Sequence, residues 1–214
     1  MTVESGIGRR RQAARQDGGA EYKARREELV KTAAEVFQEK GYEASTLNDV
    51  AERMGTDRAS LYYYVGSKQE LFQEVVQDVL EANLKEARRI KKEALKPSEK
   101  LARLVRTMMV SYEENYPFTY VYIQEDMSRV ASQDSEWAQT MTSRTRSFEK
   151  IVKGFIEEGV AKKEFRSDIS PEVAANGLYG MLNWTHRWFR PGRGLDANQV
   201  AESFASLFLE GMRR

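Results

Sequence analysis

The chain has 214 residues, of which 41% are hydrophobic, and its 34 basic and 33 acidic side chains leave a formal net charge of +1. It contains no cysteine and a single histidine, which excludes disulfides, thiolate or paired-histidine metal sites, and Cys-His nucleophiles. No stretch approaches the roughly 20 apolar residues that cross a bilayer, and the N-terminus lacks the pattern of a signal peptide. We therefore expect a cytoplasmic protein with no membrane partner and no cofactor. Since neither a Gly-rich phosphate loop nor a pair of facing carboxylates occurs, we expect no enzymatic activity either.

Residues 1–20 combine backbone flexibility with positive charge. They hold four glycines and few large apolar side chains, so ordering entropy is not offset and we expect disorder. The basic side chains are Arg9, Arg10, Arg11 and Arg15. Two interpretations stay open: an arm that follows the phosphate backbone or enters a minor groove, and a solvated tail. An amphipathic helix is predicted next, over residues 22–40.

Two short helices are predicted after that first helix. One has apolar residues at i, i+3, i+4 and i+7, a capping box formed by Thr46 and Asp49, and Gly55 at its end. The other begins after Thr56 or Asp57, which are both capping residue types. Two short helices joined by a tight Gly turn are typical of a helix-turn-helix, whose second helix enters the major groove of DNA.

The second short helix offers hydrogen-bond donors to a partner. Leu61 and Val65 can face the core, whereas three adjacent tyrosines cannot all be buried on one short helix. Phenolic hydroxyls, a serine hydroxyl and a guanidinium are donors that suit phosphate oxygens and base edges, and a lysine in the first turn of the next helix could reach a phosphate. Half-buried packing of the tyrosines is the alternative. The predicted DNA-binding residues are Thr46, Asn48, Arg58, Ser60, Tyr62, Tyr63, Tyr64 and Lys68.

This region resembles the N-terminal motif of the TetR family of bacterial transcriptional repressors. The positions that carry the resemblance are Phe37, Gly41, Tyr42, Thr46, Val50, Ala51, Gly55, Leu61, Tyr62, Val65, Lys68, Gln69, Glu70 and Leu71. Thr56, Asp57 and Val65 depart from the usual residues. The resemblance implies an all-α fold of about nine helices. It divides the chain into a basic arm at 1–20, a three-helix helix-turn-helix domain at 21–67, and a larger helical ligand-binding and dimerisation domain at 68–214.

Amphipathic periodicity predicts the helices of the larger domain. Start signals include Ser170 before Pro171, and Asp196 with Gln199 three residues later. The strongly apolar segment from Phe118 onward is expected to be either a buried helix or a pocket wall. The expected helices cover about residues 68–95, 97–115, 118–127, 135–159, 171–189 and 197–208.

The last two helices carry features of a dimer interface. Glycines three apart inside a helix cost roughly 1 kcal/mol each relative to alanine, and close approach of another backbone would offset that cost. The resemblance implies that these helices form a four-helix bundle across a two-fold axis. A homodimer also suits a palindromic operator, because each half-site takes one recognition helix. The predicted interface residues are Gly177, Gly180, Met181, Phe204, Leu207 and Phe208.

Methionine and aromatic side chains of the second domain can line an apolar cavity with a few polar tips, although for any single residue core packing is the alternative. The stretch from Arg187 to Gly192 resembles TetR-type repressors of lipid and steroid catabolism that respond to CoA thioesters. That resemblance implies that Arg187 and Arg190 pair with CoA phosphates or an acidic head group; contacts at a helix end or a dimer interface are the alternative. The predicted ligand-binding residues are Met108, Met109, Tyr112, Tyr116, Tyr120, Phe148, Phe155, Trp184, Arg187 and Trp188.

Together these features predict a ligand-responsive transcriptional regulator. We expect a repressor that binds a palindromic double-stranded DNA operator as a homodimer and is released by a small apolar or acyl-CoA-like effector. The alternative is a TetR-like DNA-binding or helical interaction protein with no small-molecule ligand. A cavity in the second domain favours the first hypothesis, and a solid core favours the second.

Overall fold

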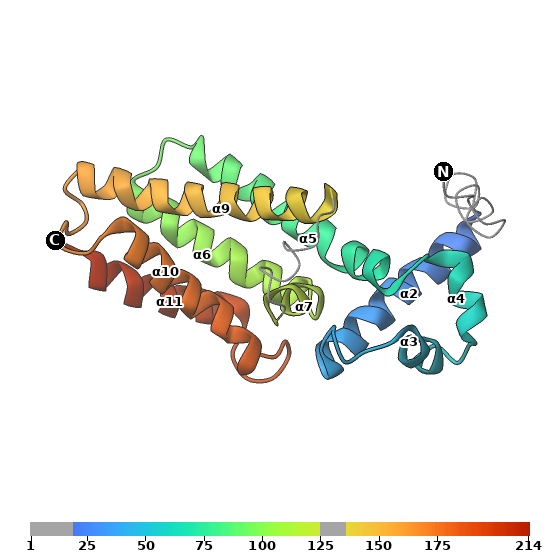
Figure 1. Ribbon diagram of the computed structural model, residues 1–214. Coiled ribbons are helices and arrows are strands. Elements are labelled where there is room, and N and C mark those ends of the chain that lie inside the picture. Colours follow the sequence, from blue (N-terminus) through green and yellow to red (C-terminus); the bar gives the residue numbers. More distant parts are fainter. Residues whose placement is uncertain (1–18, 125–135) are drawn as a thin grey trace. The chain divides into compact units, whose positions relative to one another are not determined.

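The computed structural model describes residues 19–124 and 136–214, and apart from one isolated β-bridge between Phe165 and Arg213 the regular secondary structure of these ranges is helical (Figure 1). The all-α prediction is therefore confirmed. Among the described residues, no helix combines the length and apolarity that crossing a membrane requires. The nine α-helices and one 3₁₀ helix of these ranges are α2 (Ala20–Lys40), α3 (Leu47–Arg53), α4 (Arg58–Tyr64), α5 (Lys68–Lys91), α6 (Pro97–Glu114), α7 (Phe118–Gln124), α9 (Glu136–Ala161), α10 (Pro171–Asn183), η1 (Trp184–Arg187) and α11 (Ala197–Met212).

The chain divides into two compact units, and the division falls after Asp78, inside α5. From the sequence we expected the boundary between the two domains earlier, at the start of α5, between residues 67 and 68. The first turns of α5 belong to the N-terminal unit because Leu71 and Phe72 are buried there, and the ring of Phe72 lies 6.2 Å from that of Phe37. The predicted N-terminal arm lies outside the described residues, apart from Gly19 and Ala20 at the start of α2.

Local hydrogen bonds explain where the helices of the N-terminal unit begin and end. The hydroxyl oxygen of Thr46 accepts from the Asp49 backbone N–H at 3.2 Å, and the Asp49 carboxylate accepts from the Thr46 N–H at 2.7 Å. This is the predicted capping box. Gly55, with a φ of +64°, makes the turn between α3 and α4, a conformation that glycine adopts without steric cost.

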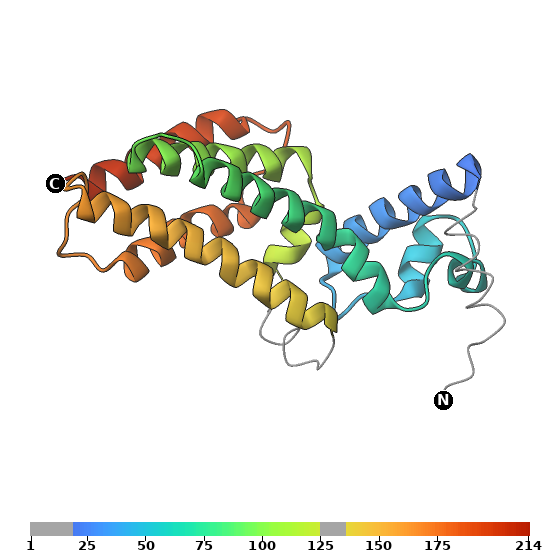
Figure 2. The ribbon, with the colours of Figure 1, turned by 90° about the horizontal axis from the view of Figure 1, so that it is seen from above.

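In the C-terminal unit α6 packs against α9, α10 and α11, and both ribbon views show it among these helices (Figures 1 and 2). The buried core includes Leu104, Met109 and Val152. The ring of Phe165 packs directly against the backbone of α9 at Gly159. A Cβ at position 159 would lie 2.1 Å from that ring. Only glycine therefore allows this ring to pack against α9.

The last helices of this unit differ in length from the prediction. The helix expected to reach residue 189 ends at Asn183 and tightens into η1, because the buried Thr185 hydroxyl donates to the Leu182 carbonyl at 2.6 Å. Arg190 then donates to the carbonyls of His186 and Phe189 at 2.9 and 2.8 Å. The alternative interpretation of Arg190, a contact at a helix end, is the one that the structure shows.

Candidate functional site

The N-terminal end of α4 is held by the side chain of Asp57. Its two carboxylate oxygens accept from the backbone N–H and the hydroxyl of Ser60, at 2.9 and 2.8 Å. The hydrogen bond from the Ser60 N–H lowers the pKa of Asp57 below its ordinary value. The Ser60 hydroxyl therefore serves the cap, and Asp57 acts as a structural residue of α4.

The exposed face of α4 presents a prearranged arginine. Arg58 donates to the Tyr62 hydroxyl through Nη2 at 2.8 Å and through Nε at 3.2 Å, and its guanidinium lies 5.5 Å from the centre of the Tyr62 ring. Leu61 and Val65, on the other face, are 1% exposed. A guanidinium that is already oriented loses less rotamer entropy when it binds a phosphate or a guanine edge.

The three tyrosines of α4 divide between surface and packing. The ring of Tyr64 is half-buried and stacks on Tyr22 of α2 at 5.1 Å. Tyr63 is 42% exposed, although one edge meets Tyr22 at 5.6 Å. Both interpretations of the tyrosines thus apply in part, because Tyr64 packs against α2 whereas Tyr63 remains accessible to a partner.

Lys68 lies inside the N-terminal unit instead of pointing outward. Its ammonium donates to the carbonyls of Tyr42, Glu43 and Ser45 at 2.7, 3.3 and 2.9 Å, and it lies 4.3 Å from the centre of the Tyr42 ring. An ammonium group has three N–H donors, and these carbonyls occupy all three. The structure therefore gives Lys68 the role of holding the loop between α2 and α3, which differs from the phosphate contact that we expected.

The C-terminal unit contains a cavity of about 310 Å³, lined by side chains of α5, α6, α7, α9 and α10. Its apolar wall consists of Leu80, Leu84, Met108, Ile123, Phe148 and Leu182. Small-molecule sites have volumes of about 300 to 1,000 Å³, so this cavity lies at the small end of the range.

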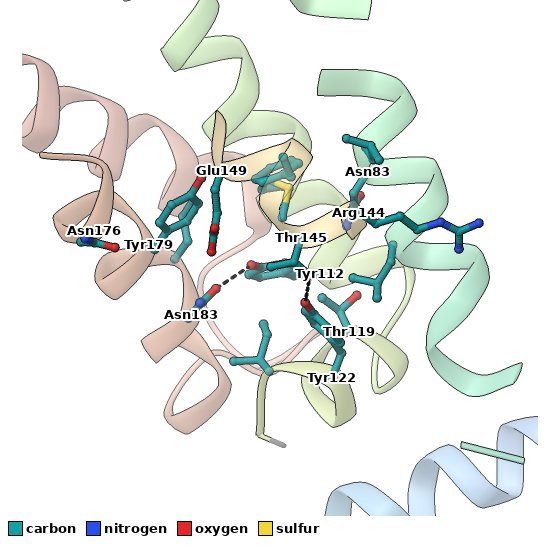
Figure 3. A pocket seen from close by; sticks show the side chains of 16 residues that line it. Asn83, Tyr112, Thr119, Tyr122, Arg144, Thr145, Glu149, Asn176, Tyr179 and Asn183 are labelled. Carbon is teal, nitrogen blue, oxygen red and sulfur yellow. Dashed lines mark hydrogen bonds between the residues drawn. The ribbon is translucent and has the colours of Figure 1, made fainter. Parts of the chain in front are cut away.

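Neutral hydroxyl and amide groups interrupt the apolar wall (Figure 3). Tyr112 donates to the side-chain oxygen of Asn183 at 3.3 Å, and the hydroxyls of Tyr122 and Thr145 are 2.7 Å apart. Burial raises the pKa values of Tyr112 and Tyr122 above the ordinary phenol value. Both phenols therefore keep their protons at physiological pH.

Charged groups stand at the edges of the cavity. Arg144 of α9 pairs with Glu81 of α5 at 3.2 Å, and Figure 3 shows its guanidinium directed toward α5 and away from Tyr112. On the other side of the view, the exposed Glu149 lies beside Tyr179. Burial, followed by the charge of Glu149, raises the pKa of Tyr179. The interior between these charged groups suits an uncharged molecule.

A separate apolar surface covers the outer faces of α10, η1 and α11. Val173, Trp184 and Leu207 are 63%, 60% and 67% exposed, and an added Cβ at Gly177 or Gly180 would meet no described atom within 4 Å. Val173, Gly177, Gly180 and Trp184 follow a helical spacing of four, three and four residues, so they lie along one stripe. Exposed apolar stripes of this kind mark protein interfaces.

Comparison with known proteins agrees with this geometry. The family model described as "Bacterial regulatory proteins, tetR family" matches residues 29–75, and that described as "Tetracyclin repressor-like, C-terminal domain" matches residues 94–212. The chain belongs to the TetR family. It is accordingly a helix-turn-helix transcriptional regulator and not an enzyme.

Individual TetR-family proteins are similar along most of the chain. The HTH-type transcriptional repressor KstR2 of Mycolicibacterium smegmatis is 28% identical over 189 residues, which are 88% of this chain and 91% of that protein. The solved structure of the ketosteroid transcriptional regulator KstR2 of Mycobacterium tuberculosis gives a TM-score of 0.81 at 27% identity, covering 89% of this chain and 95% of that one. The crystal structure of the TetR-family regulator PfmR of Thermus thermophilus gives a TM-score of 0.72 at 31% identity, and the match covers 87% of this chain and 99% of that one.

The structure brings together only some of the predicted ligand-binding residues of this TetR-family chain. Met108, Tyr112 and Phe148 line the cavity. The remaining predicted residues lie elsewhere because they face the core or the exterior. Met109, Tyr120 and Phe155 are buried in the core, Tyr116 packs edge-on against Tyr120, and Trp184, Arg187 and Trp188 are exposed.

Sequence reasoning missed several polar residues of the cavity, namely Asn83, Thr119, Thr145 and Tyr179. A single polar residue on an amphipathic helix does not reveal from the sequence that it lines a cavity, because its neighbours in the cavity come from helices that are distant in the chain.

The predicted interface residues differ in exposure. Leu207 is exposed, whereas Phe208 is 9% exposed and belongs to the core cluster. Met181 and Phe204 are half-buried.

Proposed function

We propose that this TetR-family repressor acts in the cytoplasm as a homodimer, which binds a palindromic operator and leaves it when a small apolar effector occupies the cavity. The observation that carries the DNA-binding part is the exposed face of α4, where Tyr62 holds the guanidinium of Arg58. Arginine pairs with the O6 and N7 atoms of guanine in the major groove. Arg58 and Tyr63 on α4, and Asn48 on α3, are therefore the proposed residues of sequence readout.

Dimerisation through α10 and α11 is supported by their exposed apolar side chains. Val173, Trp184 and Leu207 are all more than half exposed in the single chain. A two-fold axis beside these helices would bury them against their copies and place one α4 in each half-site of the operator.

The effector part of the proposal rests on the cavity and on α5. Asn83 and Leu84 of α5 line the cavity, and the same helix begins at Lys68, directly after the helix-turn-helix. A ligand that prefers one position of α5 would shift the population toward that state and release the operator. The volume of about 310 Å³ suits the acyl part of a CoA thioester, with the nucleotide outside. The similarity to KstR2, which is named a ketosteroid regulator, supports a polycyclic acyl group.

Selection from a pool of randomised duplexes tests the DNA-binding part. We expect the wild-type protein to enrich one palindromic motif, and Arg58→Ala to lose preference at one base of each half-site, since a bidentate contact is worth about 1 to 3 kcal/mol. Lys31→Met, an exposed change on α2, should leave the motif unchanged. Enrichment of the same motif by Arg58→Ala would exclude Arg58 from readout.

A further inference from the structure

Two hydroxyls of the cavity lack a hydrogen-bond partner. Five residues with hydroxyl groups line it: Tyr112, Thr119, Tyr122, Thr145 and Tyr179. Tyr112, Tyr122 and Thr145 are paired within the protein. The buried hydroxyl oxygens of Thr119 and Tyr179 have no partner among the described residues.

Thr119 is buried with a hydroxyl that no described residue pairs. The residue is only 3% exposed, and while its backbone N–H donates to the Asn115 carbonyl at 3.3 Å, its hydroxyl remains unpaired in the described part of the chain. A buried hydroxyl without a partner costs free energy that a valine of the same shape would avoid. A ligand oxygen in the cavity would remove that cost.

The two hydroxyls lie on different walls of the cavity. Thr119 belongs to α7 and Tyr179 to α10, and Figure 3 shows them on opposite sides of the Tyr112 side chain. The pKa of Tyr179 is raised by burial, so its hydroxyl keeps its proton and can donate. The lining also holds the amides of Asn83 and Asn176 and the charged groups of Arg144 and Glu149. Nη1 of Arg144 is a further buried atom without a hydrogen-bond partner among the described residues, although Nη2 of the same guanidinium pairs with Glu81.

We infer that Thr119 and Tyr179 select the effector, and that the part of the effector inside the cavity is an uncharged, compact apolar body with two hydrogen-bonding oxygens, one for each hydroxyl. This inference rests on the proposed function, because it specifies the chemistry of the same cavity. A thioester or ketone carbonyl, or a hydroxyl group, could supply either oxygen. A saturated hydrocarbon chain would leave both hydroxyls unpaired and should bind less tightly.

Thermal unfolding of the ligand-free protein gives the first test, with Thr119→Val and Thr145→Val as a matched pair. Removal of an unpaired hydroxyl should leave the melting temperature unchanged or raise it. Removal of the Thr145 hydroxyl breaks its bond to Tyr122 and should lower the melting temperature by about 2 to 4 °C, as expected for a chain of this size. A melting temperature of Thr119→Val as low as that of Thr145→Val would mean that Thr119 is paired within the protein, which overturns its assignment.

Calorimetric titration with two bicyclic probes gives the second test. Decalin-1,5-dione carries two ketone oxygens and 1-decalone carries one, on the same carbon skeleton. The wild-type protein should bind the dione on the order of tenfold more tightly, and Thr119→Val or Tyr179→Phe should abolish that advantage. Equal affinity for both probes, no binding of either, or an advantage that both variants retain would overturn the inference. Neither test involves DNA, so loss of operator binding would contradict the proposed function alone.

Discussion

At the residue scale, two cations of the DNA-binding unit have different roles that their sequence positions do not reveal. Arg58 is exposed and held by one neighbouring hydroxyl, which keeps it available to a partner. Lys68 donates to three carbonyls of the loop between α2 and α3, so all three N–H donors of its ammonium are engaged inside the N-terminal unit. Both residues follow a capping residue at the start of a helix, so their local sequences are alike. The roles differ because the fold places the carbonyls of the loop between α2 and α3 beside Lys68 and not beside Arg58.

Lys68→Met should therefore destabilise the protein without changing the electrostatics of DNA binding. Loss of the three charge-assisted hydrogen bonds should lower the free energy of unfolding by about 1 to 3 kcal/mol, measured by urea unfolding with Lys31→Met as the surface control. The salt dependence of DNA binding should keep its slope. A slope reduced by about 0.9, the value for one lost phosphate contact, would show instead that Lys68 binds the backbone of DNA.

At the element scale, helix starts follow from local sequence whereas the cavity does not. The capping residues Thr46, Asp57, Ser170 and Asp196 lie within three residues of the groups they bind. The sequence therefore predicted three of these helix starts directly and narrowed the start of α4 to Thr56 or Asp57. The cavity requires five helices to converge, and no local pattern encodes which of their polar residues meet. The end of α10 depends on one buried hydroxyl, that of Thr185, and was likewise unpredictable.

The cap of α3 makes the stability of the N-terminal unit depend on pH. Hydrogen bonds from Lys40 and from Thr46 lower the pKa of Asp49 to about 2, below its ordinary value of 3.8. A depressed pKa contributes stability that is present above the unfolded-state value and is lost as the pH falls toward the folded-state value. The urea midpoint of the wild type should thus fall between about pH 4 and pH 2 more steeply than that of Asp49→Asn. Identical profiles for the two proteins would contradict this role of Asp49.

At the scale of the whole molecule, the exposed apolar surface of α10, η1 and α11 determines how two copies of the chain could assemble. A lysine in place of Leu207 would put a charge where the proposed interface is apolar, so Leu207→Lys should sediment as a monomer and bind operator DNA weakly. Glu202→Lys changes the charge on another face of α11 and should remain a dimer. A dimeric Leu207→Lys protein with unchanged DNA affinity would place the interface elsewhere.

Operator binding is the central claim, and fluorescence anisotropy tests it most directly. The purified protein would be titrated against duplexes tiled from the DNA upstream of its own gene, with random duplexes as controls and the salt concentration varied. We predict saturable binding to one tile, at least about 1,000-fold tighter than to random DNA, and a preference for that tile at least about tenfold smaller in Arg58→Ala. Weak binding of similar strength to every tile and to random DNA would contradict the account.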